Sequence, residues 1–289
     1  MLGWFRATCP CDPEAKRWVE ERLRWLSRQF GLHILLERSI ILPTDEFFPD
    51  AYDGSPKSVR RLFRRVCQYM EVDPEDIEFK LYKDRTSSSL PGFDPTRGFA
   101  AGTWQGAEEP DGSDRQRRRG RRIRRAGREA GQADDSAGDQ PWQKGIIKIE
   151  ESILDRVADL IGTMAHELSH QRLLGEGRAE VEAFDNELLT DLTAVYHGFG
   201  VFIANNTHKS TGKLHYWPGT KLRRPEYISE PMLGYALAHM AWFRDEDRPK
   251  WANALGWVAR GVFKQGLRYL QTTADSSFKP VRLRQKGDS

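Results

Sequence analysis

Residues 145–175 read GIIKIEESILDRVADLIGTMAHELSHQRLLG, and this stretch carries the strongest structural signal in the chain. Residues 145–149 are rich in isoleucine and are typical of a strand. From residue 152 to residue 174, apolar side chains recur at helical spacing, and Gly175 is a suitable end for that helix. The stretch therefore predicts a sheet strand that leads into a long amphipathic helix.

The predicted helix carries the motif His166-Glu167-Leu168-Ser169-His170. Histidines four residues apart project from one helix face, so their imidazoles can bind one Zn²⁺ at about 2.0–2.1 Å. Glu167 would lie beside the metal, where its carboxylate can take a proton from a bound water and pass it to a leaving group. The alternative is that both histidines are ordinary helix residues, paired with solvent or with core carbonyls. We favour a zinc site, because the motif falls on a strongly predicted helix.

A catalytic zinc site needs a third protein ligand and leaves a fourth position open to water. We favour Glu187, which lies 17 residues after His170 at the start of a second predicted helix. Asp191 follows one turn later, where it can accept the free N–H of a ligand histidine and fix the orientation of that ring. Glu176 and His197 are the alternative third ligands.

Together, HELSH at 166–170 and NELLTD at 186–191 resemble the active-site helix and the glutamate helix of the gluzincins, the zinc metallopeptidase family of thermolysin and neprilysin. The resemblance covers about 30 residues. It implies that His166, His170 and Glu187 bind zinc, that Glu167 is the catalytic base and that Asp191 supports a ligand histidine. It also implies an upper lobe whose sheet packs on the active-site helix.

A peptidase of this kind also needs a donor that stabilises the oxyanion of a tetrahedral intermediate. The downstream candidates are His208, His215, Tyr216, Tyr227, Tyr235 and His239. We favour Tyr235 and His239 as catalytic residues, because they are four residues apart and share one face of a predicted helix. The alternative is that these two residues are ordinary helix packing.

The rest of the chain divides into an α/β half and a helical half. Before residue 106, the pattern predicts helices at 13–30 and 58–70 and strands at 33–42, 78–82 and 99–104. After residue 176, it predicts helices at 180–205, 231–244 and 251–270. We therefore expect an α+β, zincin-like fold. Its α/β upper lobe comprises residues 1–106 and 141–175, with a small sheet packed on the motif helix, and its helical lower lobe comprises residues 176–289.

Residues 107–140 lack apolar periodicity, so we expect a disordered insertion. Residues 114–132 hold nine arginines against one aspartate and one glutamate, a local charge of +7 in a chain whose net charge is +3. The remainder is therefore mildly acidic, at −4. Clustered arginines from Arg115 to Arg128 would favour nucleic acid or an acidic protein partner. The alternative is a solvated loop with no specific role.

The composition of the chain favours a globular protein and argues against a membrane-spanning or disulfide-rich one. Hydrophobic residues make up 38% of the chain, which favours a globular fold, and no apolar run approaches the 20 or so residues of a membrane span. Cys9, Cys11 and Cys67 are too few for a disulfide framework, and no second pair completes a zinc site at Cys9-Pro10-Cys11. The first ten residues lack the apolar core of a secretion signal, so we expect a cytoplasmic protein.

These observations lead to one main functional hypothesis and one alternative. We expect a cytoplasmic Zn²⁺-dependent metallopeptidase that hydrolyses peptide or protein substrates without any membrane partner. The alternative is a non-catalytic protein on a zincin scaffold, whose Arg-rich segment binds nucleic acid or an acidic partner.

Overall fold

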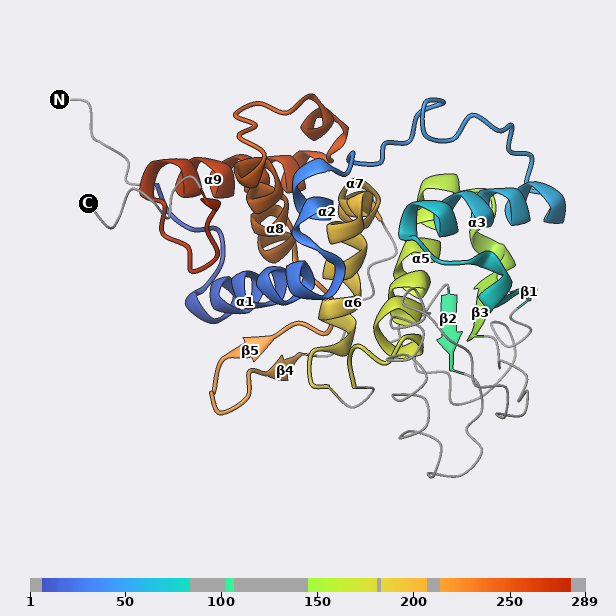
Figure 1. Cartoon of the computed structure of the whole chain (residues 1–289), viewed down its shortest axis with the longest axis horizontal. Helices are drawn as coiled ribbons and strands as arrows, with labels where there is room; N and C mark the ends of the chain where they lie inside the picture. Colours follow the sequence, from blue (N-terminus) through green and yellow to red (C-terminus); the bar gives the residue numbers. More distant parts are fainter. Residues whose placement is uncertain (1–6, 84–101, 107–144, 181–182, 207–213, 282–289) are drawn as a thin grey trace, which may run out of the picture.

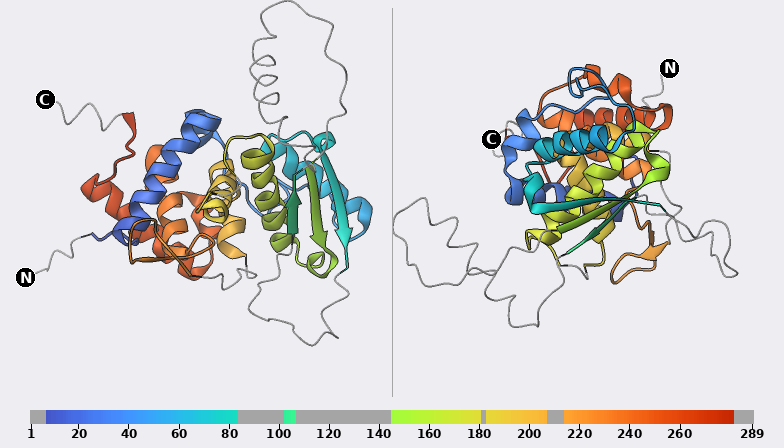
Figure 2. Two further views of the ribbon diagram at one scale, coloured as in Figure 1. Left: turned by 90° about the horizontal axis from the view of Figure 1, so that it is seen from below. Right: turned by 90° about the vertical axis from the view of Figure 1, so that its right-hand side faces the viewer.

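The computed structural model of the chain describes residues 7–83, 102–106, 145–180, 183–206 and 214–281. Figure 1 shows two halves side by side, and the view from below in Figure 2 shows the same division. One half contains a small sheet with helices α3 (Pro56–Met70) and α5 (Val157–His170). The other contains helices α1 (Pro13–Phe30), α8 (Glu230–Phe243) and α9 (Trp257–Thr273). Helix α6 (Asn186–Ala194) lies between the halves.

The sheet has three strands in the order β1–β3–β2. Strand β1 (Ile77–Tyr82) runs parallel to β3 (Gly145–Glu150), and β2 (Gly102–Gln105) pairs with β3 in the antiparallel sense. Alternate residues of β3 are buried, as expected of a strand with one face against a core. Helix α5 contacts both β2 and β3, and α3 packs on α5. The sheet therefore supports the helix that carries the two motif histidines.

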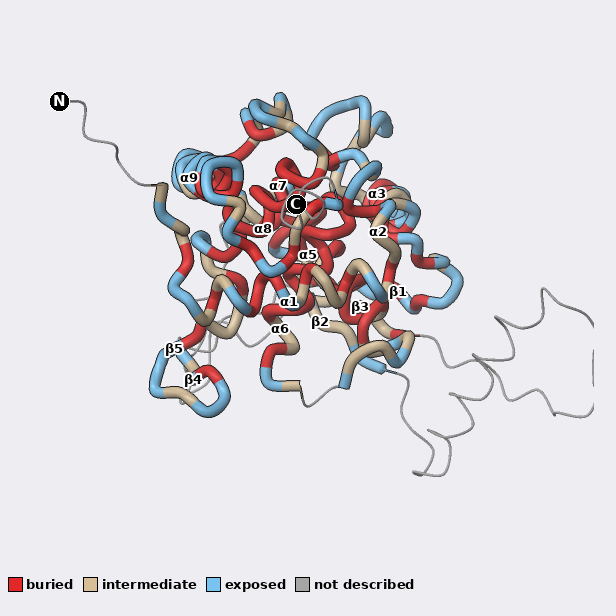
Figure 3. Tube along the Cα trace, turned by 60° about the vertical axis from the view of Figure 1, so that its left-hand side comes forward, coloured by how far each residue is buried: buried red, intermediate tan, exposed pale blue. Residues whose placement is uncertain are grey.

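The helical half is built around α8, whose residues are buried on all sides. Figure 3 shows this buried centre surrounded by more exposed helices. Helix α9 approaches α8 closely, because Gly234 has no side chain: a Cβ there would lie 2.5 Å from Val262. Helix α1 covers another side of α8 with its apolar face, which includes Trp18 and Leu23. This packing anchors α8 as a core element.

Helix α6 continues through a π-helical turn, Val195–Phe199, into α7 (Gly200–Asn205). Gly198 breaks the helical path with φ +98°, and a Cβ at this position would lie 2.7 Å from the carbonyl oxygen of Ser39. The carbonyl of Gly198 accepts the Ile41 N–H at 2.9 Å. Only glycine admits both this backbone conformation and this close approach.

The remaining elements are short. They are α2 (Leu32–Glu37), the two-stranded hairpin of β4 (His215–Tyr216) and β5 (Arg223–Arg224), 3₁₀ turns at Pro74–Asp76, Glu151–Ile153 and Lys250–Ala254, and a second π-helical turn at Gln171–Gly175. The π turn at Gln171–Gly175 follows directly on α5, so the motif helix ends in irregular geometry.

Several predicted elements are confirmed. The helices expected at 13–30, 58–70 and 231–244 and the strands expected at 78–82 and 145–149 agree with the structure within about two residues. Asp12 caps α1 by accepting the N–H groups of Glu14 and Ala15, and Gly31 ends it. In these segments, local pattern and tertiary packing favour the same structure.

Four expectations need correction. The strand predicted at 33–42 is wrong, because residues 32–37 form helix α2 and bury Ile34 and Leu35 against the core. The helix expected at 180–205 begins only at Asn186 and is broken at Gly198. The helix expected at 152–174 begins at Val157, after a 3₁₀ turn. The helix expected at 251–270 begins at Trp257, also after a 3₁₀ turn.

The fold is mixed α+β and mostly helical. Helix α1 packs on α8, so it lies with the C-terminal helices, whereas we expected all of residues 1–106 in the sheet lobe. The Arg-rich segment at 107–140 lies outside the described residues, as do residues 99–101 of the predicted strand at 99–104. In the parts of the chain that the structure describes, no helix is both long enough and apolar enough to cross a membrane.

Candidate metal centre

Helices α5 and α6 bring the two motif histidines and Glu187 together. His166 and His170 project from the same face of α5, and Glu187 comes from the first turn of α6, which packs beside it. Oε2 of Glu187 lies 3.2 Å from Nε2 of His166 and 3.6 Å from Nε2 of His170. Among the described residues, this is the one group of three or more potential metal ligands whose atoms converge.

The other nitrogen of each histidine has its own partner. Nδ1 of His166 lies 2.9 Å from Oδ1 of Asp191, which can only accept, so this nitrogen carries the proton. The hydroxyl of Thr190 donates to the Asn186 carbonyl at 2.8 Å, which leaves its oxygen to accept from Nδ1 of His170 at 3.3 Å. Both rings are thereby held with Nε2 directed toward Glu187.

This donor set fits a zinc ion. Two imidazole nitrogens and one carboxylate oxygen all lie within 4.8 Å of one another, and their lone pairs repel one another unless a cation or a proton lies between them. Tetrahedral zinc with bonds of about 2.0–2.2 Å separates its ligand atoms by about 3.4 Å. The two observed separations, 3.2 and 3.6 Å, bracket that value. His166, His170 and Glu187 would therefore hold the metal and leave one position for water.

The pKa shifts of His166 and Glu187 also indicate that a positive charge is stabilised at the cluster. Burial alone would lower the pKa of His166, but its hydrogen bonds to Asp191 and Glu187 raise this pKa well above its usual value. Burial would also raise the pKa of Glu187, but the hydrogen bonds to His166 and His170 lower it strongly. The carboxylate of Glu187 is thus ionised and available as a ligand near neutral pH.

Glu167 lies beside the cluster rather than in it. Its carboxylate is buried, and Oε2 has no hydrogen-bond partner among the described residues. Burial raises the pKa of Glu167, while His166 and His170 oppose that rise. A buried carboxylate with one free oxygen and a raised pKa is suited to accept a proton and release it again.

The structure places Tyr227 next to the cluster, with its ring 6.1 Å from the ring of His166. The following residue, Ile228, donates its backbone N–H to Oδ2 of Asp191 at 3.0 Å, which fixes this loop to α6. Burial first, and then the charges of Glu187 and other acidic neighbours, raise the pKa of Tyr227. Its phenol therefore keeps its proton and can donate a hydrogen bond.

Tyr235 and His239, the pair we favoured for this role, lie elsewhere. Both are fully buried in α8. The hydroxyl of Tyr235 donates to Oε1 of Glu20 at 2.8 Å, and Nε2 of His239 lies 3.0 Å from Oγ of Ser276. Their contacts join α8 to α1 and to the C-terminal segment, so the structure does not bring them to the metal cluster. Tyr227 was among the candidates from the sequence, but the two residues favoured there, Tyr235 and His239, do not reach the cluster.

The other candidates have different surroundings. Glu176 pairs with Arg178 at 2.7 Å and with Arg172 at 3.4 Å, so it serves as a counter-ion to these arginines and is not part of the group of converging ligands. His197 is fully buried, with its ring 4.9 Å from Phe30, outside the group of converging ligands. His215 and Tyr216 form β4, and His208 lies outside the described residues.

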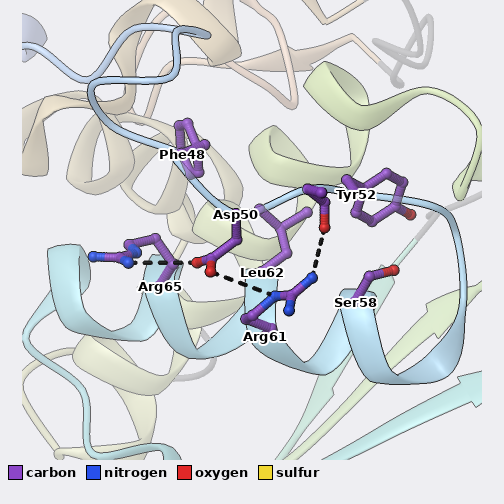
Figure 4. Close-up of a pocket in the computed structure, with 8 residues that line it drawn as sticks. Phe48, Asp50, Tyr52, Ser58, Arg61, Leu62 and Arg65 are labelled. Carbon is purple, nitrogen blue, oxygen red and sulfur yellow. Dashed lines mark hydrogen bonds and ion pairs between the residues drawn. The ribbon is translucent and has the colours of Figure 1, made fainter.

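Two cavities are identified in the described residues, and neither is lined by a residue of this cluster. The larger, of about 510 Å³, lies between α1 and the C-terminal segment, where Arg24, Ser277 and Lys279 are among its lining residues. The smaller lies between the loop at Phe48 to Tyr52 and helix α3, where Arg61 and Arg65 both pair with Asp50 (Figure 4). Its volume of about 20 Å³ has room for roughly one water molecule. It therefore offers no space for a substrate.

No family model, no curated protein and no solved structure matches the chain. The interpretation of this site therefore rests on its geometry.

Proposed function

We propose that this protein is a zinc-dependent metallopeptidase of the gluzincin type. The observation that carries the proposal is the convergence of two imidazole nitrogens and one carboxylate oxygen, with the free oxygen of Glu167 beside them. Three protein ligands with an adjacent carboxylate are the arrangement typical of zinc hydrolases, whereas structural zinc sites use four protein ligands.

The chain supplies the residues that each step requires. When bound, zinc polarises a carbonyl group and lowers the pKa of a coordinated water to about 7. Oε2 of Glu167 takes the proton of the attacking water and delivers it to the leaving amine. Asp191 and Thr190 keep the two ligand rings oriented throughout. The Tyr227 hydroxyl donates a hydrogen bond to the carbonyl oxygen as negative charge develops there.

A peptide is the substrate class that suits the surroundings of the cluster. Strand β2 forms one edge of the sheet, and its Trp104 lies beside His170. An extended peptide can add to such an edge through main-chain hydrogen bonds, which brings its own carbonyl groups close to the cluster. We propose peptide or protein substrates on this ground.

The replacement of Glu167 by Gln tests the proposal. Glu167→Gln keeps the size of the side chain and leaves His166, His170 and Glu187 untouched, so zinc content should be unchanged while peptide hydrolysis is lost. Hydrolysis would be followed with a mixture of fluorogenic peptides, and Glu176→Gln is the matched control. Full activity in Glu167→Gln would refute the mechanism.

The second candidate function rests on the Arg-rich segment. Its nine arginines favour binding of nucleic acid or an acidic partner, and the flanking residues belong to β2 and β3, next to the cluster. A non-catalytic zincin-like protein would then bind such partners with a steep salt dependence. Deletion of residues 115–128 tests this directly, and unchanged binding to a DNA or RNA duplex after the deletion would exclude the role. A cytoplasmic location remains part of the proposal.

A further inference from the structure

Trp104 contacts the end of the motif helix through its side chain. The indole lies nearly parallel to the His170 imidazole, with an interplanar angle of 20° and ring centroids 6.3 Å apart. Its Nε1–H donates to Oε1 of Gln171 at 2.9 Å. One side chain from the edge strand thus touches a proposed zinc ligand and the residue that follows it.

Two glycines make room for this contact. A Cβ at Gly145 would lie 2.5 Å from Oε1 of Gln171 and 3.0 Å from Nε1 of Trp104. A Cβ at Gly175 would lie 2.4 Å from the same Gln171 oxygen. Gln171 can therefore reach Trp104 only because β3 begins with glycine and the π turn ends with glycine.

The main chain of Trp104 acts on the proposed general base. Its backbone lies close enough to the carboxylate of Glu167 to favour the ionised form, and so it opposes the rise in pKa that burial causes in that group. Trp104 therefore contacts Glu167 through its backbone and His170 through its ring. These two residues have different roles in the proposed function, and one residue of β2 fixes both.

His170 needs this support more than His166 does. The bond from His166 to the Asp191 carboxylate measures 2.9 Å and involves a charged acceptor. The bond from His170 to the neutral Thr190 hydroxyl is longer, at 3.3 Å. Bonds to charged groups are roughly twice as strong as neutral ones, so the His170 ring is the less firmly oriented of the two. A nearly parallel indole beside it limits the rotation of the ring.

We propose that Trp104 is a positioning residue: together with Gln171, it holds strand β2 against the end of α5 and so fixes the His170 ring and the Glu167 carboxylate relative to each other. The consequence for hydrolysis rests on the proposed function. The consequence for metal affinity does not, because it depends only on the orientation of His170.

Cobalt binding tests this inference without an activity assay. Co²⁺ replaces Zn²⁺ in such sites, and its visible absorption bands report the geometry of its ligands. Wild type, Trp104→Leu, Trp104→Phe and Gly175→Ala would each be titrated with Co²⁺ against a chelator. Trp257→Leu is the matched control, because Trp257 is 88% exposed on α9.

We expect Trp104→Leu to bind Co²⁺ about tenfold more weakly and to shift its absorption bands, since residues that orient metal ligands contribute roughly 10–100-fold. Trp104→Phe should recover part of the affinity, because it keeps a ring against His170. Gly175→Ala should shift the bands as well, since it displaces Gln171 without touching a ligand, and it serves as the test if Trp104→Leu does not fold. Trp257→Leu should match wild type.

The outcomes separate this inference from the proposed function. Wild-type affinity and spectra in both Trp104→Leu and Gly175→Ala would overturn the inference alone. Metal binding that depends on Trp104, in a protein that hydrolyses no peptide, would overturn the proposed function alone. A wild-type protein that binds neither Co²⁺ nor Zn²⁺ would overturn both.

Discussion

The Asp191 carboxylate joins His166 to the loop that carries Tyr227. Oδ1 accepts from Nδ1 of His166 at 2.9 Å, and Oδ2 accepts the Ile228 N–H at 3.0 Å. One carboxylate therefore orients a proposed zinc ligand and also positions the proposed oxyanion donor. Asp191 is 6% exposed, so water competes little for either bond.

Asp191→Asn should weaken zinc binding by about 10–100-fold, because the amide removes the charge that holds the His166 ring. Competition with a chelator of known affinity measures this change. Asp76→Asn is the control, because Asp76 is exposed and distant in the sequence from Asp191, and this variant should bind zinc like wild type. Equal affinity in Asp191→Asn and wild type would show that Asp191 does not support the ligand.

Tyr227→Phe should lower kcat by about 10²–10³ with little change in KM, because the hydroxyl acts only when charge develops on the carbonyl oxygen. Zinc content should stay at the wild-type level. Steady-state hydrolysis of a fluorogenic peptide provides the measurement, and Tyr216→Phe on the exposed hairpin provides the control. A kcat unchanged in Tyr227→Phe would remove this residue from the mechanism.

We expect the free energy of unfolding to fall at acid pH because His239 is buried in its neutral form. Burial lowers its pKa to about 4, against the hydrogen bond to the Tyr235 carbonyl and the charge of Glu20, which favour the protonated form. The unfolded chain therefore binds a proton first as the pH falls from about 6.5 to about 4, and stability is lost over that window and retained above it. The loss amounts to about 3 kcal/mol at most.

Urea unfolding at pH 7 and at pH 4.5 measures this dependence. His239→Gln keeps a side chain that can bond to Ser276 but does not titrate, so the variant should lose less stability in acid than wild type. His197 is buried and has a lowered pKa as well, so it contributes in the same direction in both proteins. An equal acid loss in wild type and His239→Gln would exclude His239 as a source.

Sequence reasoning succeeded where local spacing fixes the geometry. The four-residue spacing of His166 and His170 places both on one helix face whatever the tertiary structure, and Glu187 needed only a second helix packed beside the first. Helix α1 was predicted because its apolar stripe, the cap at Asp12 and the end at Gly31 all agree. None of these features depends on a distant part of the chain.

The features that the sequence did not predict correctly depend on tertiary packing. Helix α8 is apolar on nearly every face, so its sequence does not show which side meets the cluster, and Tyr235 and His239 face α1 and the C-terminal segment instead. Tyr227 reaches the cluster through a loop fixed by the Ile228–Asp191 bond, which leaves no periodic signal. The run at 33–42 has the composition of a strand. In the structure, a new helix, α2, begins directly after Gly31 and includes residues 33–37 of this run.

The central claim is that His166, His170 and Glu187 bind one zinc ion. Elemental analysis of the purified protein tests it most directly, with wild type compared with His166→Ala, Glu187→Ala and the control Glu176→Ala. The account predicts about one zinc per chain in wild type and in Glu176→Ala, and none in the other two variants. A wild-type protein without zinc, or full zinc content in Glu187→Ala, would contradict it.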